Sequence, residues 1–262
     1  MKKALITYVR NEALILPLWL THHLKSFAPE DIYILDNESI DDTVKLALDK
    51  GIPSENIKTI VSKKNHSCNW LTSTASDLQN ELLSCYDWVL LAESDEFIVV
   101  DHVKCPGGWE ELMTSLSSSS VVAIRALGYD VLHRYLTEPP LDVSLPILRQ
   151  RITAMEWRPH LNRRKQLFSK PCFASVKIRW RAGAHDVLNI RDPVIDDRLI
   201  LFHLNMCDIN FTSTRRKARV GEGQVKIDGD RLDIGKALVA EINVYLRKQG
   251  ICEIPEHLRD SF

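Results

Sequence analysis

The sequence lacks three features that would place it at once in a familiar class. No run approaches the ~20 consecutive apolar residues that a membrane-spanning helix needs. Lysine and arginine number 34 and aspartate and glutamate 35, so the formal net charge of -1 gives no broad positive field for nucleic acid. The 10 glycines form neither a GxGxxG loop nor a GxxxxGK[ST] loop for binding phosphate. A membrane-embedded protein, a nucleic-acid binder and a P-loop enzyme are therefore disfavoured.

Cysteine spacing and the first residues bear on the cellular compartment. No two of the six cysteines have CxxC spacing, and free thiols in a reducing compartment explain such a scatter better than disulfides do. The apolar stretch within residues 1–10 ends at Arg10 and is too short for a secretory signal. We therefore expect a cytoplasmic protein without a transmembrane segment, with peripheral membrane contact left open.

Strand and helix signals alternate along the first hundred residues. Short apolar runs predict strands at residues 4–9, 31–35, 57–61 and 88–92, and helical patterns lie between them at 12–24, 41–50 and 71–86. This order predicts a parallel sheet with helices on both faces. Strand signals at 121–127, 176–180 and 199–202, and a closing helix at 232–246, predict a mixed, partly antiparallel second half. Because no linker or repeat divides the chain, we expect a single α/β domain over residues 1–262.

Polar clusters follow three of the predicted parallel strands. They are Arg10-Asn11-Glu12 after the first strand, Asp36-Asn37-Glu38-Ser39 after the second and Glu93-Ser94-Asp95-Glu96 after the fourth. Ligands in such sheets bind outside the carboxyl ends of the strands. The sequence therefore predicts a polar binding site at one edge of the sheet.

Glu93 and Asp95 have the spacing of a pair of metal ligands. Residues i and i+2 at a strand end point the same way, so both carboxylates can face one point. Two oxygen ligands on one side leave Mg²⁺ or Mn²⁺ open to diphosphate oxygens, whose charge the metal would neutralise. A solvated acidic turn is the alternative, but the apolar runs 88–92 and 97–100 on either side favour a buried site.

Several blocks together resemble a known family. They are YVRNE at 8–12, LDNESIDDT at 35–43, DWVLLAESDEF at 87–97, and LFHL at 201–204 followed by TRRK at 214–217. In this order they resemble the family-2-like glycosyltransferases of the GT-A superfamily, in the branch with RNE, DNxSxDxT and DxDEF blocks. The resemblance implies a Rossmann-like, mixed, mostly parallel sheet flanked by helices. It also implies transfer of a sugar, of the hexosyl type, from a nucleoside-diphosphate sugar to a hydroxyl acceptor such as a glycan, polysaccharide or glycolipid.

The same resemblance implies roles for individual residues. Arg10, Asn11 and Glu12 would line the nucleotide end of the donor pocket, and Asp36 would lie against the base or ribose, with Asn37 and Ser39 shaping the turn. Glu93 and Asp95 would take the DxD positions, with Glu93 also touching the donor, and His203 would complete a Mn²⁺ or Mg²⁺ site. Residues 1–101 would form the nucleotide-sugar half and 102–262 the acceptor half. Glu93 stands where the motif has aspartate, which leaves metal dependence open.

Two further features have functional and structural interpretations. The segment Gly183-Ala184-His185-Asp186 resembles a GxH block, and Asp186 and His185 are candidates for the base that deprotonates the acceptor, although a plain turn would also explain them. Residues 149–181 hold ten lysines and arginines and one acidic residue. This stretch is either a solvated face or a cationic wall for the donor diphosphate or an anionic acceptor.

The remaining candidates have structural interpretations. Asn11 is a candidate cap for the first helix and Asp41 and Asp42 for the second, while His22 and His23 are expected to be structural. Two other functions stay open: a metal-dependent nucleotidyltransferase, and a non-catalytic protein that binds nucleotide sugars.

Overall fold

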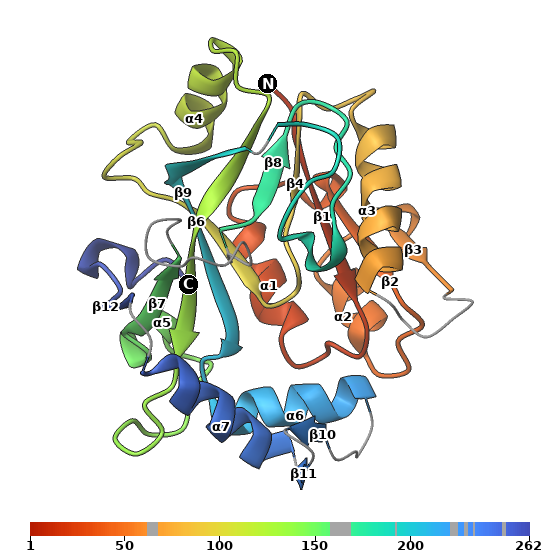
Figure 1. The fold of residues 1–262 in the computed structure, drawn as a ribbon. Coiled ribbons are helices and arrows are strands. Elements are labelled where there is room, and N and C mark those ends of the chain that lie inside the picture. The colour runs from red at the N-terminus through yellow and green to blue at the C-terminus, as the bar shows by residue number, and fades with distance from the viewer. Residues whose placement is uncertain are drawn as a thin grey trace.

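A mixed sheet organises the chain, shown as a computed structural model in Figure 1. The structure describes residues 1–61, 68–157, 169–191, 193–220, 225–227, 230–232, 234–247 and 250–262. Within these residues ten strands join one sheet in the order β12-β7-β6-β8-β4-β1-β2-β3, with β9 pairing both β6 and β5. The predicted fold class, a mixed α/β sheet flanked by helices, is confirmed.

The N-terminal half of the sheet is parallel. Strand β1 (Lys3–Val9) lies between β2 (Ile32–Asp36) and β4 (Trp88–Leu91), and β3 (Ile57–Thr59) pairs with β2. Alternate side chains of these strands enter two separate clusters. One cluster contains residues of α1 (Leu16–His23) and the other contains residues of α3 (Cys68–Leu82), so the two helices cover opposite faces of the sheet.

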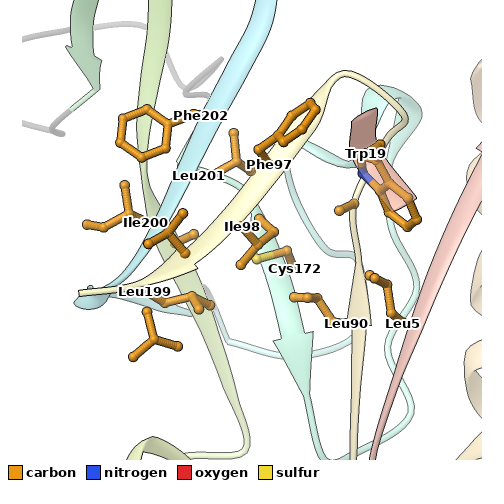
Figure 2. Packing of buried hydrophobic residues seen from close by; sticks show 14 of the residues in the cluster. Leu5, Trp19, Leu90, Phe97, Ile98, Cys172, Leu199, Ile200, Leu201 and Phe202 are labelled. Atoms are coloured by element: carbon orange, nitrogen blue, oxygen red, sulfur yellow. The ribbon is translucent and has the colours of Figure 1, made fainter. Parts of the chain in front are cut away.

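The second half is mainly antiparallel. Strand β8 (Pro171–Ala174) joins the halves because it pairs antiparallel with β4 and with β6 (Ala123–Leu132). Strand β9 (Val194–Met206) runs parallel to β6 and antiparallel to β5 (Glu96–Val100). Figure 2 shows side chains of β5 and β9 in the same buried cluster as Leu5 and Leu90 of the parallel half. One continuous core therefore fixes β9 beside the carboxyl ends of the parallel strands.

The other elements complete the frame. They are α2 (Thr43–Asp49), α4 (Gly108–Ser117), α5 (Ile147–Gln150), β7 (Thr153–Trp157), α6 (Ile209–Val220), β10 (Val225–Ile227), β11 (Asp230–Leu232), α7 (Ile234–Tyr245), β12 (Ile251–Glu253) and the 3₁₀ turns η1 (Pro29–Asp31), η2 (Ser54–Asn56), η3 (Ala182–Ala184) and η4 (Glu256–Leu258). Helices α6 and α7 lie side by side (Figure 1). Within the described part of the chain, no helix is both long enough and apolar enough to cross a bilayer.

Two local predictions were wrong. Residues 176–180 form no regular strand, only an isolated bridge from Trp180 to Val187, because backbone groups there bond to side chains of α3 such as Gln79. The strand predicted at 199–202, by contrast, is confirmed as the buried middle of the longer β9. Asn11 does not cap α1, whose N-cap is Ile15, because its side chain is used to join two loops and its backbone is left-handed, with φ of 51°.

Candidate active site

The three polar clusters lie at one edge of the sheet. Val9 at the end of β1 is in register with Asp36 at the end of β2, and the Asn37 amide donates to the Val9 carbonyl at 2.8 Å. On the other side of β1, the amide of Ala92 donates to the carbonyl of Ile6 at 3.0 Å. Parallel pairing of β1 with both neighbours thus brings residues 10–12, 36–39 and 93–96 together. We call this edge the carboxyl rim.

Arg215 of α6 joins two of these clusters. Its Nε and Nη2 donate to the two carboxylate oxygens of Glu12 at 2.6 and 3.0 Å, and its Nη1 donates to Oδ2 of Asp95 at 2.6 Å. All three side chains are buried, and Glu12 has 0% exposure. A forked guanidinium between two desolvated carboxylates is a strong, directional arrangement. Glu12, predicted to line the donor pocket, therefore supports the rim through Arg215 and has no surface of its own to offer a ligand.

Lys170, which directly precedes β8, neutralises the other two carboxylates of the 93–96 loop. Its ammonium donates to Oε1 of Glu93 at 2.6 Å and forms an ion pair with Glu96. Burial opposes the charge of Lys170, but the two carboxylates outweigh burial and raise its pKa above the ordinary value. Burial likewise opposes the charge of Glu93, yet the charge of Lys170 lowers the pKa of Glu93. Both groups are thus ionised, and Glu93 is paired with a protein cation, as Asp95 is with Arg215. The role of Glu93 as a metal ligand stays a prediction.

His203 of β9 faces the rim from a third direction. The strand register places it opposite Glu96 and opposite Asp130 of β6. Its Nδ1 donates to Oδ1 of Asp130 at 2.5 Å, and its Nε2 lies 3.5 Å from Oδ2 of Asp95. The indole of Trp157 donates to the other oxygen of Asp130 at 2.9 Å, so the carboxylate is itself fixed. Burial lowers the pKa of His203, but Asp95 and Asp130 more than offset this and raise it to about 10.

The chemistry of these donors fits a divalent cation at two of the three predicted ligands. A carboxylate behind a histidine, as Asp130 is behind His203, is the usual way that proteins orient imidazole toward a metal. Asp95 and His203 face each other, whereas Glu93 is held by Lys170. Among the residues that the structure describes, no three Asp, Glu, His or Cys side chains surround one point. The arrangement therefore suits an open site that substrate oxygens and water complete, which is typical of Mg²⁺ and Mn²⁺.

The charge balance of the cluster points the same way. Five carboxylates, of Glu12, Glu93, Asp95, Glu96 and Asp130, face the cations Lys170, Arg215 and protonated His203. Burial raises the pKa of Glu96, and even without this carboxyl the remaining four carboxylates exceed the three cations by one charge. A diphosphate brought to such a cluster is repelled unless a further positive charge joins it. A divalent cation would supply that charge, and its binding would require His203 to release the proton on Nε2.

The part of the rim at the ends of β1 and β2 is built around Asn11. Its backbone amide donates to Oγ of Ser39 at 2.9 Å, its Oδ1 accepts from the amide of Ile40, and its Nδ2 donates to the carbonyl of Ala218 in α6. Asp36 accepts from the amide of Ser39 at 3.2 Å and is buried, like Asn37, whereas Arg10 is partly exposed. Asn11 thus fixes the loop after β2 and the end of α6. Contact of Arg10, Asp36 and Asn37 with a nucleoside stays a prediction.

His185 and Asp186 lie beside the rim on a hairpin with a glycine turn. Gly183 has φ of 69°, and a Cβ at this position would lie 2.8 Å from Cδ2 of His185, so only glycine fits. Oδ1 of Asp186 accepts from Arg125 at 3.1 Å. Both candidates line a pocket of about 630 Å³. Their role as a base stays a prediction.

Signals in the sequence differ among the site residues that it left unassigned. Arg215 lies in the block that follows His203, and Lys170 lies in the basic stretch, so both had a weak signal. Asp130 was missed, although it is a single carboxylate in a strand whose ten residues are all buried. A buried charge in an apolar strand requires a partner, and that rule could have singled it out.

Comparisons with known proteins bear on the fold of the chain. No family model matches it, and no curated protein does. It is similar to the solved structure of S. aureus TarS 1–349, with 13% identity and a TM-score of 0.40 over 93% of this chain and 71% of that one. The same TarS segment in complex with UDP has 12% identity and a TM-score of 0.39, over 93% of this chain and 71% of that one. A mycobacterial protein has 11% identity and a TM-score of 0.43, over 96% of this chain and 82% of that one. The match spans 43% of a longer TarS structure. The roles of the rim residues rest on the geometry of this chain.

Proposed function

We propose that this protein is a glycosyltransferase that moves a sugar, of the hexosyl type, from a nucleoside-diphosphate sugar to a hydroxyl acceptor. The observation that carries the proposal is the pairing of Asp95 with His203 at the carboxyl rim, with Asp130 behind the histidine and Arg215 beside the aspartate. A site for a charged leaving group needs fixed polar groups at the position where charge develops. The buried network supplies such groups without further rearrangement.

Each residue has a defined task in this proposal. Asp95 and His203 would hold a Mn²⁺ or Mg²⁺ ion, which would neutralise charge on the departing nucleoside diphosphate. Asp130 holds the His203 ring in position, and Arg215 keeps Asp95 aligned. The bound nucleoside would lie near Arg10, Asn37 and Asp36, at the ends of the first two strands. Positioning and electrostatics would then supply most of the rate gain.

A thermal-shift panel tests the proposal. The panel contains nucleoside diphosphates and nucleotide sugars with uridine, guanosine, thymidine and cytidine bases, each with and without Mn²⁺. A ligand present at 100 times its Kd stabilises the folded state by about 2.7 kcal/mol, which corresponds to a rise in Tm of roughly 5–10 °C for a chain of this size. We expect such a rise for at least one nucleotide, larger with Mn²⁺. If no member raises the Tm, the proposal is wrong.

Adding nucleoside triphosphates to the panel, and measuring product release from the nucleotides that bind, separates the two alternative functions. A nucleotidyltransferase would be stabilised by a nucleoside triphosphate and would release pyrophosphate. A non-catalytic binder would be stabilised by a nucleotide sugar but would leave it intact during long incubation with Mn²⁺. The ion pair between Glu93 and Lys170 is the feature that keeps the binder under consideration, because it removes one expected metal ligand.

A further inference from the structure

The pocket lined by His185 and Asp186 lies beside the carboxyl rim. Its volume is about 630 Å³, which is within the range of roughly 300–1,000 Å³ typical of small-molecule sites. One wall is the N-terminal part of α3, with Asn69, Ser73 and Ser76, and the other wall is the hairpin of residues 179–188. We call it the hairpin pocket. Glu12, Asp95, Lys170 and Arg215 do not line this pocket, so a ligand bound in it would contact a different set of residues.

The hairpin is held rigidly against its surroundings. Its two sides are joined by backbone bonds from Arg181 to Asp186 and from Leu188 to Arg179, at 2.9 and 2.8 Å. The backbone amide of Trp180 donates to Ser76 of α3, and its indole donates to the carbonyl of Pro171 at 2.6 Å. A pocket with walls fixed in this way is preformed and loses little entropy when a ligand binds.

Arg125 ties the hairpin pocket to the rim. Its Nη1 donates both to the carbonyl of Ser169 at 3.0 Å and to the carbonyl of His185 at 2.9 Å. Ser169 directly precedes Lys170, the partner of Glu93, and Pro171, whose carbonyl binds Trp180, directly follows it. A molecule in the hairpin pocket is therefore separated from the Glu93 and Lys170 pair by one short segment of chain.

The pocket lining is positively charged. Arg179 and Arg181 are exposed, and Asp186 is the lining residue with a negative charge. Asp186 is already bound to Arg125 at 3.1 Å and lies 3.6 Å from Arg181. Across the described residues, no carboxylate forms an ion pair with Arg179 within 4 Å. Two exposed guanidinium groups and one shared carboxylate leave a surplus of positive charge toward the pocket.

We propose that the hairpin pocket is the acceptor subsite, and that the acceptor carries a phosphate or carboxylate beside the hydroxyl that receives the sugar. The inference rests on the proposed function, since an acceptor must lie next to the donor site. Guanidinium groups bind both anions with paired hydrogen bonds. Asn69 and Ser73 offer hydrogen-bonding partners for hydroxyl groups. His185 and Asp186 are then close to the hydroxyl that loses its proton.

Amide NMR of the whole chain, with UDP and the diamagnetic Mg²⁺ present, tests the proposal with three matched probes. They are glucose, glucose 6-phosphate and glucuronate, which share the ring hydroxyls and differ in charge. The resonance of the Trp180 indole reports on this pocket. We expect Kd values for the two anions at least about tenfold lower than for glucose. Arg179→Ala and Arg181→Ala should each raise the Kd values of the two anions by about tenfold, which is the equivalent of losing one charged hydrogen bond.

Controls separate this inference from the proposed function. Lys177→Ala removes an exposed charge from the same loop, outside the pocket lining, and should leave all three Kd values unchanged. Equal binding of glucose and its phosphate, or equal effects of Lys177→Ala and Arg179→Ala, would overturn the proposal. So would displacement of the anion by UDP, or binding of inorganic phosphate as tight as that of the sugar phosphate. In each of these cases the Tm shift with nucleotides would persist; loss of that shift would refute the proposed function instead.

Discussion

Replacing Arg215 by methionine tests the buried network most severely. Methionine has a similar length but no charge, so Arg215→Met leaves Glu12 and Asp95 buried and facing each other without the cation between them. Removing one partner of a buried ion pair costs about 3–5 kcal/mol, mainly because the remaining charge is stranded. That loss is a large share of the 5–15 kcal/mol by which a typical domain is stable, about a third to a half at the middle of that range.

Urea unfolding of matched variants measures the effect. Arg216→Met is the control, because Arg216 is the next residue on α6 and pairs with Glu241 at 3.1 Å on a partly exposed surface. Such a pair is worth at most about 1 kcal/mol. We expect the double variant Glu12→Gln with Arg215→Met to regain part of the loss, since it removes one of the two stranded charges. If Arg215→Met costs no more than Arg216→Met, the rim is not held together by this ion pair.

Three further predictions concern the metal, acid stability and the glycine turn. In the presence of UDP, Mn²⁺ affinity measured by EPR should fall about 10–100-fold in Asp130→Asn, whereas Glu93→Gln should change it little. A larger loss of affinity in Glu93→Gln than in Asp130→Asn would instead indicate that Glu93 is a metal ligand. Burial lowers the pKa of His22 to about 4, so the unfolded chain binds more protons between pH 6.5 and 4. His22 should therefore contribute about 2 kcal/mol to the fall in stability at pH 5, and the neighbouring His23, whose pKa burial also lowers, adds to that fall; urea midpoints of His22→Gln should show a smaller fall. Gly183→Ala, at a φ of 69° and against the His185 ring, should cost about 1–2 kcal/mol in urea unfolding; an unchanged midpoint would contradict the turn geometry.

The sequence predicted the parallel half of the fold better than the site. Its strands are apolar on both faces, so short hydrophobic runs located them, and parallel pairing then required residues 10–12, 36–39 and 93–96 to meet. The partners of those residues come from far along the chain, as with Arg215 and Asp95. Spacing along the sequence cannot show such contacts.

Pattern also failed where side chains replace regular pairing. Residues 176–180 alternate in polarity like a strand, but Gln79 and Ser76 of α3 take the backbone groups that a neighbouring strand would have used. Helix α6 has few apolar residues and gave no clear periodic signal, yet it carries Arg215. Tertiary contacts decided both cases.

Hydrolysis of the donor is the most direct test of the central claim, that Asp95 at the carboxyl rim acts on the diphosphate of a nucleotide sugar. The nucleotide sugar that raises the Tm most would be incubated with Mn²⁺ and the wild-type protein or Asp95→Ala, and release of nucleoside diphosphate would be measured by chromatography. The proposed function predicts slow release by the wild type and none above the protein-free rate by Asp95→Ala, with circular dichroism showing that both are folded. Equal release by the two proteins, or no release from any donor that binds, would contradict it.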